Sequence, residues 1–393
     1  MAIYSKIALV ILALYLYFQY KIKTKTIPIN IEIYNIIDSI THTVDKQQLI
    51  SYESYNYAEN FGEYSYITNI YNTSKDIIGI TENIEKTNNN KYVLWIPGCG
   101  DVFCHPFVTK ELIKKGYDIY ALDLPNLGFA YYDFNSYLKY PSVAEIIGYL
   151  NCVINFIDSQ YNNPYRVIYG ISLGAAIAMF YISLYPDVFS KCILNGPSID
   201  DRLTKKDYYR ALTGYISLLY DIDMSYINNT RGELFIVVLS MYVYDIRQYG
   251  ITKDYIKNIT DYFKTHNKLN PNHINSITGR PNLIVKSNEF LSKDLLLYHI
   301  KQRIVNTTYD IPTLILCSDI YIDETNVCLD YSKPDFGLSK FGDMIVNVNC
   351  IEENAKRVFT NYKLIRLENA SHDVFYSKKT VRDKAIREFA NFL

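Results

Sequence analysis

The segment Gly170–Gly174, which reads Gly-Ile-Ser-Leu-Gly, is the part of this sequence best suited to chemistry. It lies between a β-rich apolar run, residues 166–169, and an alanine-rich stretch, residues 173–184. Where a strand turns sharply into a helix, the central residue takes strained backbone angles and flanking glycines avoid collisions. The Ser172 hydroxyl would then stand at a helix N-terminus, where the dipole stabilises negative charge. The pattern predicts a nucleophilic serine, and the alternative is a serine that only caps the helix.

A nucleophilic serine needs a base, and the sequence contains six histidines. Five of them lie in a linker, before a predicted helix, or in an irregular central region: His42, His105, His266, His273 and His299. His372, in contrast, follows the last predicted strand. A loop at that position reaches a serine at the carboxyl edge of the same sheet. His372 is therefore the predicted base, and the alternative is an ordinary surface histidine.

Alternating strand-like and helix-like segments predict the element that positions these residues. Apolar runs at 92–96, 117–122, 166–169 and 191–194 alternate with helical stretches, and an antiparallel pair, 64–71 with 77–81, precedes them. Such alternation predicts an α/β fold with a mostly parallel sheet flanked by helices. The rhythm stops at 199–310, which reads as helical in patches, and resumes with strands at 312–317 and 362–367 and a helix at 380–393. We expect one core, residues 61–198 and 311–393, with a helical insertion at 199–310.

The N-terminal 25 residues differ from the rest of the chain. Residues 7–20 carry no charge, and they are flanked by Lys6, Lys21, Lys23 and Lys25. The apolar stretch approaches the ~17–25 residues that span a bilayer, and no cleavage site of a signal peptide follows it. Residues 1–25 are predicted to be an apolar helix that anchors the protein in a membrane, with the body on the cytoplasmic side. The alternative is an apolar helix packed on the body, and residues 26–60 are predicted to be a linker.

Composition excludes several classes of protein. Lysine and arginine number 40 against 41 aspartate and glutamate, so the chain lacks the basic footprint of a nucleic-acid binder. Hydrophobic residues make up 49% of the chain, which allows a packed core. There are seven cysteines and no Cys-x-x-Cys pair, and the cluster Cys99, Cys104 and His105 lacks the remaining ligands of a zinc site. No metal site is predicted.

Taken together, these residues resemble the α/β-hydrolase superfamily. The strand–Gly-x-Ser-x-Gly–helix unit, the order serine, acid, histidine, and the segment His372–Ser377 carry the resemblance, which covers roughly residues 60–393. Its nearest branch is that of lysophospholipases and monoacylglycerol lipases, the serine aminopeptidase-like hydrolases. The resemblance implies an α/β-hydrolase fold, a helical lid at residues 199–310, and no metal or organic cofactor.

The resemblance also implies an aspartate after the penultimate strand that orients the histidine. Asp319 follows that strand at once, whereas Asp343 begins the sequence Asp-Met-Ile-Val. This matches the Asp-x-Ile/Val-Val loop of the family, and Asp343 lies 29 residues before His372, a separation typical of the family, compared with 53 for Asp319. Asp343 is the predicted acid, and Asp319 is the alternative.

Two main-chain N–H groups are expected to form the oxyanion hole of such a site. One belongs to Leu173, which follows the nucleophile. The other belongs to the loop after residues 92–96, where the family usually has His-Gly and this sequence has Pro97-Gly98-Cys99. Cys99 is therefore the predicted second donor, although the histidine of the family is missing.

The function implied is hydrolysis of carboxylic esters, lipid-derived ones such as monoacylglycerols or lysophospholipids. Ser172 would attack the carbonyl, His372 would move the proton, and Asp343 would fix the imidazole tautomer. Peptidase, thioesterase and acyltransferase activities use the same triad. A second hypothesis is a catalytically silent hydrolase fold that binds lipid or serves as a scaffold at a membrane, which the altered loop at Cys99 would suit.

Overall fold

The computed structural model describes the following residues: 50–53, 59–61, 64–73, 76–98, 103, 105–128, 130, 140–199, 296–297, 300–322, 342–343 and 345–393. The predicted anchor at 1–25 and most of the predicted linker and lid lie outside these residues. None of the helices in the described ranges is long and apolar enough to cross a membrane.

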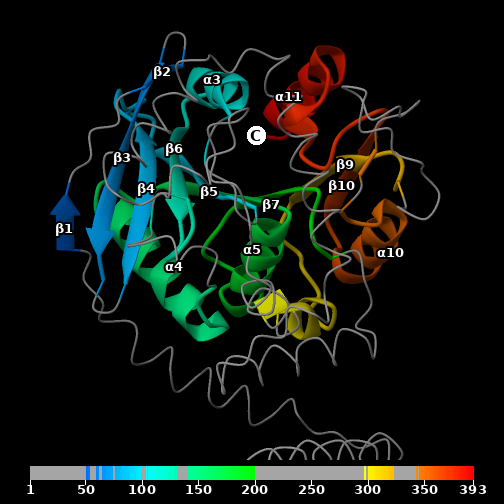
Figure 1. Cartoon of the computed structure of the whole chain (residues 1–393), viewed down its shortest axis with the longest axis horizontal. Helices are drawn as coiled ribbons and strands as arrows, with labels where there is room; N and C mark the ends of the chain where they lie inside the picture. Colours follow the sequence, from blue (N-terminus) through cyan, green and yellow to red (C-terminus); the bar gives the residue numbers. More distant parts are fainter. Residues whose placement is uncertain are drawn as a thin grey trace, which may run out of the picture. The chain divides into compact units, whose positions relative to one another are not determined.

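A single sheet forms the centre of the described part of the chain (Figure 1). Its order is β1-β3-β4-β6-β5-β7-β8-β9-β10, and β2 pairs with β3. The first four strands are β1 (Ile50–Glu53), β2 (Glu59–Phe61), β3 (Tyr64–Asn72) and β4 (Ile77–Asn83). The other six strands, which are neighbours in the second half of this order, are parallel to one another. They are β5 (Lys91–Ile96), β6 (Asp118–Asp123), β7 (Tyr165–Ile171), β8 (Lys191–Asn195), β9 (Thr313–Ser318) and β10 (Tyr362–Leu367). The predicted mostly parallel sheet is confirmed, as is the antiparallel pair β3–β4.

Helices cover both faces of this sheet. Figure 1 shows α3 (Pro106–Lys114) and α11 (Lys379–Phe392) on one face, and α4 (Val143–Asp158), α5 (Leu173–Leu184) and α10 (Val348–Val358) on the other. Central strands are therefore buried on both sides, and every residue of β6 and β9 is buried. This explains why they read as continuous apolar runs rather than alternating ones.

The helix α10 was not expected from the sequence. It joins β9 to β10, which are parallel neighbours and therefore need a crossover connection. Its buried apolar residues are Val348, Ile351, Ala355 and Val358, which follow helical spacing. The structure also has two short strands in the predicted linker, residues 26–60: β1 lies wholly inside this range and β2 partly.

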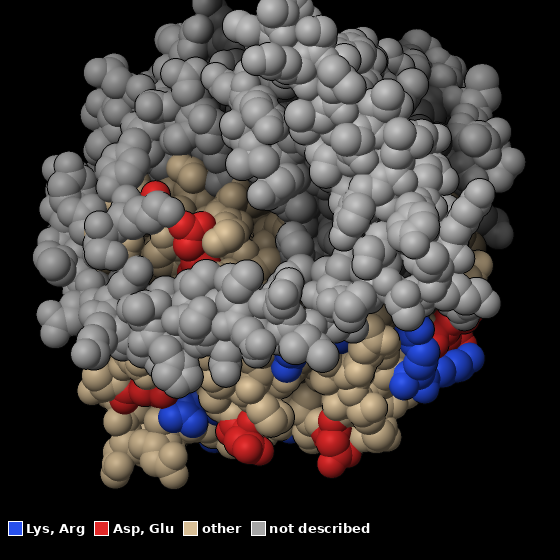
Figure 2. Space-filling view, turned by 90° about the horizontal axis from the view of Figure 1, so that it is seen from below, with Lys and Arg blue, Asp and Glu red and all other residues tan. Residues whose placement is uncertain are grey.

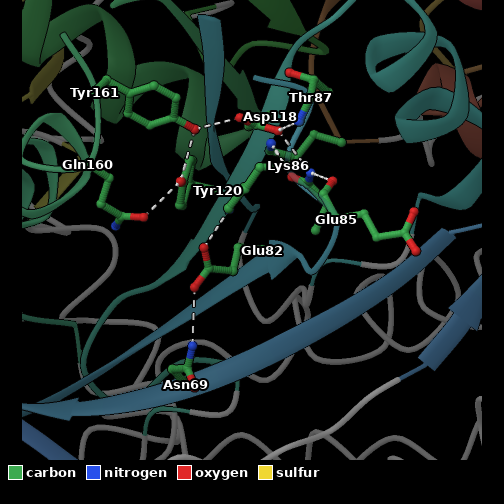
Figure 3. A network of polar contacts seen from close by, with 11 residues as sticks. Asn69, Glu82, Glu85, Lys86, Thr87, Asp118, Tyr120, Gln160 and Tyr161 are labelled. Carbon is green, nitrogen blue, oxygen red and sulfur yellow. Dashed lines mark hydrogen bonds and ion pairs between the residues drawn. The ribbon is translucent and has the colours of Figure 1, made fainter. Parts of the chain in front are cut away.

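A buried carboxylate fixes the amino-terminal edge of the parallel strands (Figure 3). Asp118, the first residue of β6, accepts hydrogen bonds from Asn83 Nδ2 at 2.9 Å and from the Thr87 N–H at 2.8 Å. Its other oxygen accepts from the Tyr161 hydroxyl at 2.7 Å. Burial, and then the bonds to Tyr120 and Asp118, raise the pKa of the Tyr161 phenol. Because three donors bond to the Asp118 carboxylate, its burial is tolerated. The same bonds connect β4, β6 and the turn after α4.

Charged side chains of both signs are interspersed on the described surface that Figure 2 shows. Lysine and arginine side chains lie near aspartate and glutamate side chains, with uncharged residues between them.

Candidate active site

Ser172 lies in a strained turn between β7 and α5. Its φ of 53° and ψ of −117° fall where a residue with a side chain rarely lies. A Cβ on Gly170 would come within 2.5 Å of the Gly174 carbonyl oxygen, and a Cβ on Gly174 within 2.2 Å of the Ile96 carbonyl oxygen. Both glycines are therefore required by backbone contacts, which is the steric reason for the Gly-x-Ser-x-Gly spacing.

His372 lies after β10 and is paired with Asp343. The distance from His372 Nδ1 to Asp343 Oδ2 is 2.8 Å, and both side chains are buried, at 4% and 0% exposure. The other carboxylate oxygen of Asp343 accepts from the N–H groups of Ile345 and Val346, at 2.7 and 2.9 Å. Three donors thus hold the Asp343 carboxylate in one orientation toward the imidazole.

The backbone near β9 explains why Asp343 reaches His372. The Asp343 N–H donates to the Ile320 carbonyl at 3.0 Å, and the Ile322 N–H donates to the Asp343 carbonyl at 2.8 Å. The chain therefore returns to the exit of β9 after residues 323–341, of which nothing is described. Asp319 has a different place, since its carboxylate accepts from the Asn369 N–H at 3.1 Å in the turn after β10. Of the two candidate acids, the structure brings Asp343 to the imidazole.

Gly196, at the exit of β8, lies against His372 and was not recognised in the sequence. Its φ is +48°, and a Cβ there would lie 2.5 Å from the His372 carbonyl oxygen and 3.1 Å from the ring atoms Cε1 and Nδ1. A side chain at this position would push the imidazole away from Asp343. The sequence signal was a glycine directly after a buried strand, in Asn195-Gly196-Pro197.

A second serine lies beside the predicted nucleophile. The hydroxyl oxygens of Ser172 and Ser198 are 3.4 Å apart, and the Ser198 N–H donates to the Ser172 carbonyl at 3.2 Å. Both residues are buried. No sequence pattern marks Ser198, because it reaches this place only through the position of β8 beside β7.

The predicted oxyanion donors are described in part. Leu173 is the first residue of α5 and is buried. A Cβ on Gly98 would lie 3.4 Å from Ser172 Cβ, so the exit of β5 passes close to the predicted nucleophile. Cys99 lies outside the described residues.

A small hollow with mostly apolar walls opens beside Gly98 and Leu173. Its other walls are Ile96, Pro97, Leu122, Asp123, Leu124, Leu127, Tyr140 and Ile177. Most of the walls beside the two expected oxyanion segments are therefore apolar.

Two of the described cysteines, Cys192 and Cys317, differ from reactive thiols. Burial raises the pKa of the Cys317 thiol to about 12 and also raises that of Cys192. A thiol that stays protonated is a poor nucleophile and a poor metal ligand. In the part of the chain that the structure describes, no group of three or more His, Cys, Asp or Glu side chains could hold a metal ion.

Comparison with known proteins relates the chain to hydrolases. Residues 62–224 match the model of the family described as serine aminopeptidase, S33. None of the curated proteins matches this sequence. Solved structures with a similar arrangement include a monoacylglycerol lipase of Paleococcus ferrophilus, at 12% identity and a TM-score of 0.47, covering 77% of this chain and 93% of that one. Another is the thioesterase domain of the curacin biosynthetic pathway, at 12% identity and a TM-score of 0.46, covering 83% and 98%. Est1E of Butyrivibrio proteoclasticus with bound ferulic acid has 13% identity and a TM-score of 0.43, covering 80% and 95%.

Proposed function

We propose that this chain is a serine hydrolase of the α/β-hydrolase superfamily and that it cleaves carboxylic esters through an acyl-enzyme on Ser172. One observation carries the proposal. A serine with φ of 53° follows β7, and a buried His372–Asp343 pair follows β9 and β10 at the carboxyl edge of the same parallel sheet. The chain thus provides the three kinds of group that acyl transfer needs: a nucleophile, a base and an acid.

In this mechanism each residue has one task. Ser172 Oγ attacks the ester carbonyl while His372 Nε2 takes its proton and later gives it to the leaving alcohol. Asp343 Oδ2 accepts a hydrogen bond from the Nδ1–H of His372, which leaves Nε2 without a proton, and the carboxylate then stabilises the imidazolium. The main-chain N–H groups of Leu173 and Cys99 would bind the oxyanion. Water then attacks the acyl-enzyme through the same base.

We further propose a lipid-derived substrate, such as a monoacylglycerol or a lysophospholipid. Two features support it: the apolar walls of the hollow beside Gly98 and Leu173, and the richness of residues 199–310 in Leu, Ile, Tyr and Phe. The uncharged run at residues 7–20 with lysines on both sides supports attachment to a membrane, with the enzyme on the cytoplasmic side. An enzyme held there would meet such esters at the bilayer surface.

A fluorophosphonate probe tests the proposal, because it reacts with an activated serine in place of the ester. We expect the wild-type protein to be labelled at Ser172 and the Ser172→Ala variant to be unlabelled, with its circular dichroism unchanged. Ser198→Ala is the matched control, since it removes the hydroxyl 3.4 Å away and should keep the label. A wild-type protein that is folded and unlabelled would favour the silent-scaffold hypothesis instead.

A further inference from the structure

A second buried histidine–aspartate pair lies directly beside the first. His105 Nε2 is 2.8 Å from Asp373 Oδ2, and the two side chains are 1% and 0% exposed. Asp373 follows His372 in the sequence, so one loop carries a member of each pair. The mechanism above uses His372 and Asp343 and leaves this second pair without a task.

Asp373 is held from three directions. Besides His105, it accepts hydrogen bonds from Asn195 Nδ2 at 2.7 Å and from the Phe375 N–H at 2.9 Å, both on Oδ1. Since Oδ1 is occupied by two donors, we assign the proton of the His105 bond to Nε2, which donates to Oδ2. The carboxylate therefore fixes the first turn after His372, the helical turn η4 (Val374–Tyr376).

Asn195 connects this network to the nucleophile. Its side-chain oxygen accepts from the Val374 N–H at 3.2 Å, and its main-chain oxygen accepts from the Ser172 N–H at 2.9 Å. The backbone of Ser172 and the loop of His372 are thus fixed by one residue at the end of β8. His105 lies at the far end of this chain of bonds, where it begins α3.

His105 itself has little freedom to move. Its ring centroid is 4.7 Å from that of Trp95, and the Trp95 ring is in turn 3.7 Å from the Tyr169 ring. Its carbonyl oxygen accepts from the N–H groups of Val108 and Thr109 in the first turn of α3, both at 3.1 Å. A donor fixed this firmly can transmit its position to Asp373.

We propose that His105 is a positioning residue for the reaction: through Asp373 it fixes the backbone of His372, so that the imidazole keeps its contact with Asp343. This inference rests on the proposed serine hydrolase function. Stability alone does not require a polar pair here, because replacing both partners of a buried hydrogen bond with apolar groups of the same shape can be nearly neutral. A pair retained beside the base of the proposed triad is better explained by the geometry that it imposes.

Three variants of the full-length protein separate positioning from stability. His105→Phe keeps an aromatic ring beside Trp95 and removes the donor, whereas His105→Gln keeps an N–H group that reaches Asp373 at a similar distance. Tyr161→Phe is the matched control: it removes one of three donors from Asp118, an equally buried carboxylate at the opposite edge of the sheet (Figure 3). For each we would measure the thermal midpoint, the rate of fluorophosphonate labelling, and kcat and KM for a soluble short-chain ester.

A positioning role predicts a specific pattern. His105→Phe should lower kcat and the labelling rate about 100-fold, the effect of a displacement near 1 Å in a catalytic group, while KM changes little. His105→Gln should recover most of this loss. Tyr161→Phe should lower the thermal midpoint and leave kcat nearly unchanged.

Other results would overturn the inference, and they differ from failure of the proposed function. If the wild type is labelled and folded His105→Phe keeps its full kcat, the pair is merely structural and the serine hydrolase remains. Should His105→Phe fail to fold, His105→Asn decides, since its amide is too short to reach Asp373. Full activity in folded His105→Asn would refute positioning. If the wild type is not labelled at all, the proposed function fails and this inference fails with it.

Discussion

The Nδ1 atom of His372 and the Oδ2 atom of Asp343 lie 2.8 Å apart, although α10 and β10 lie between the two residues in the sequence. The contact arises because both residues follow the carboxyl ends of neighbouring parallel strands, β9 and β10. Asp343 reaches this edge through its backbone bonds to Ile320 and Ile322. Asp319 leaves the same strand earlier and is bonded to the turn at Asn369 instead.

The first prediction concerns the acid of the proposed triad. Asp343→Asn should lower kcat about 10⁴-fold, because an amide favours the wrong imidazole tautomer and does not stabilise the imidazolium. Asp319→Asn is the control and should lower kcat less than about 10-fold, since its carboxylate only caps a turn. Steady-state kinetics on a soluble ester measures both. The reverse order of effects would contradict the assignment.

The second prediction concerns the glycine behind the imidazole. Gly196→Ala should place a methyl group against the His372 carbonyl and ring, and displacement of the base should lower kcat roughly 100-fold. The positive φ adds a backbone strain of about 1–2 kcal/mol. Gly116→Ala is the matched control, because Gly116 also has a positive φ, +80°, in the turn between α3 and β6. It should lose stability and keep kcat, and equal losses of kcat in the two variants would refute the prediction.

The third prediction concerns alkaline pH. Burial raises the pKa of Tyr71 and of Tyr117 from 10.0 to about 12. The unfolded chain therefore loses these protons first as pH rises, so their contribution to stability is complete below about pH 10 and is lost between about pH 10 and 12. Urea unfolding at a series of pH values, with tyrosinate absorbance as the titration signal, measures this. The double variant Tyr71→Phe/Tyr117→Phe should show a shallower fall, and an unchanged slope would argue against these two phenols.

The fourth prediction concerns the N-terminal segment. Deletion of residues 1–25 should release the protein from membranes, because the uncharged run at 7–20 is removed. Hydrolysis of a soluble short-chain ester should continue, since the proposed triad lies in the sheet domain. Fractionation of cells followed by an esterase assay tests both parts. A truncated protein that is unfolded would mean that the segment packs on the body, and an unchanged membrane fraction would mean that attachment lies elsewhere.

The sequence alone determined the features that depend on short-range sterics and burial. Gly170 is needed because of the backbone atoms of Gly174 and Ala175 in the same turn, so part of the pattern around Ser172 can be read locally, whereas Gly174 is constrained by the Ile96 carbonyl of the neighbouring strand β5. The central strands are apolar throughout because helices cover both faces, so their runs also stand out in the sequence. His372 could be chosen among six histidines because its place after the last strand defines the sheet edge. Asp343 was preferred to Asp319 only with the help of the family resemblance.

Tertiary structure decided the contacts between segments that are distant in the sequence. Gly196 is constrained by His372, which the chain brings to it only when β9 and β10 have joined the sheet beside β8. His105 looked like a residue before a helix, yet its partner Asp373 is 268 positions away. Neither Asn195 nor Ser198 has a local pattern, because each acts through the neighbouring strand. Periodicity and turn chemistry report on nearby atoms along the chain, whereas these residues owe their roles to neighbours that only the folded sheet provides.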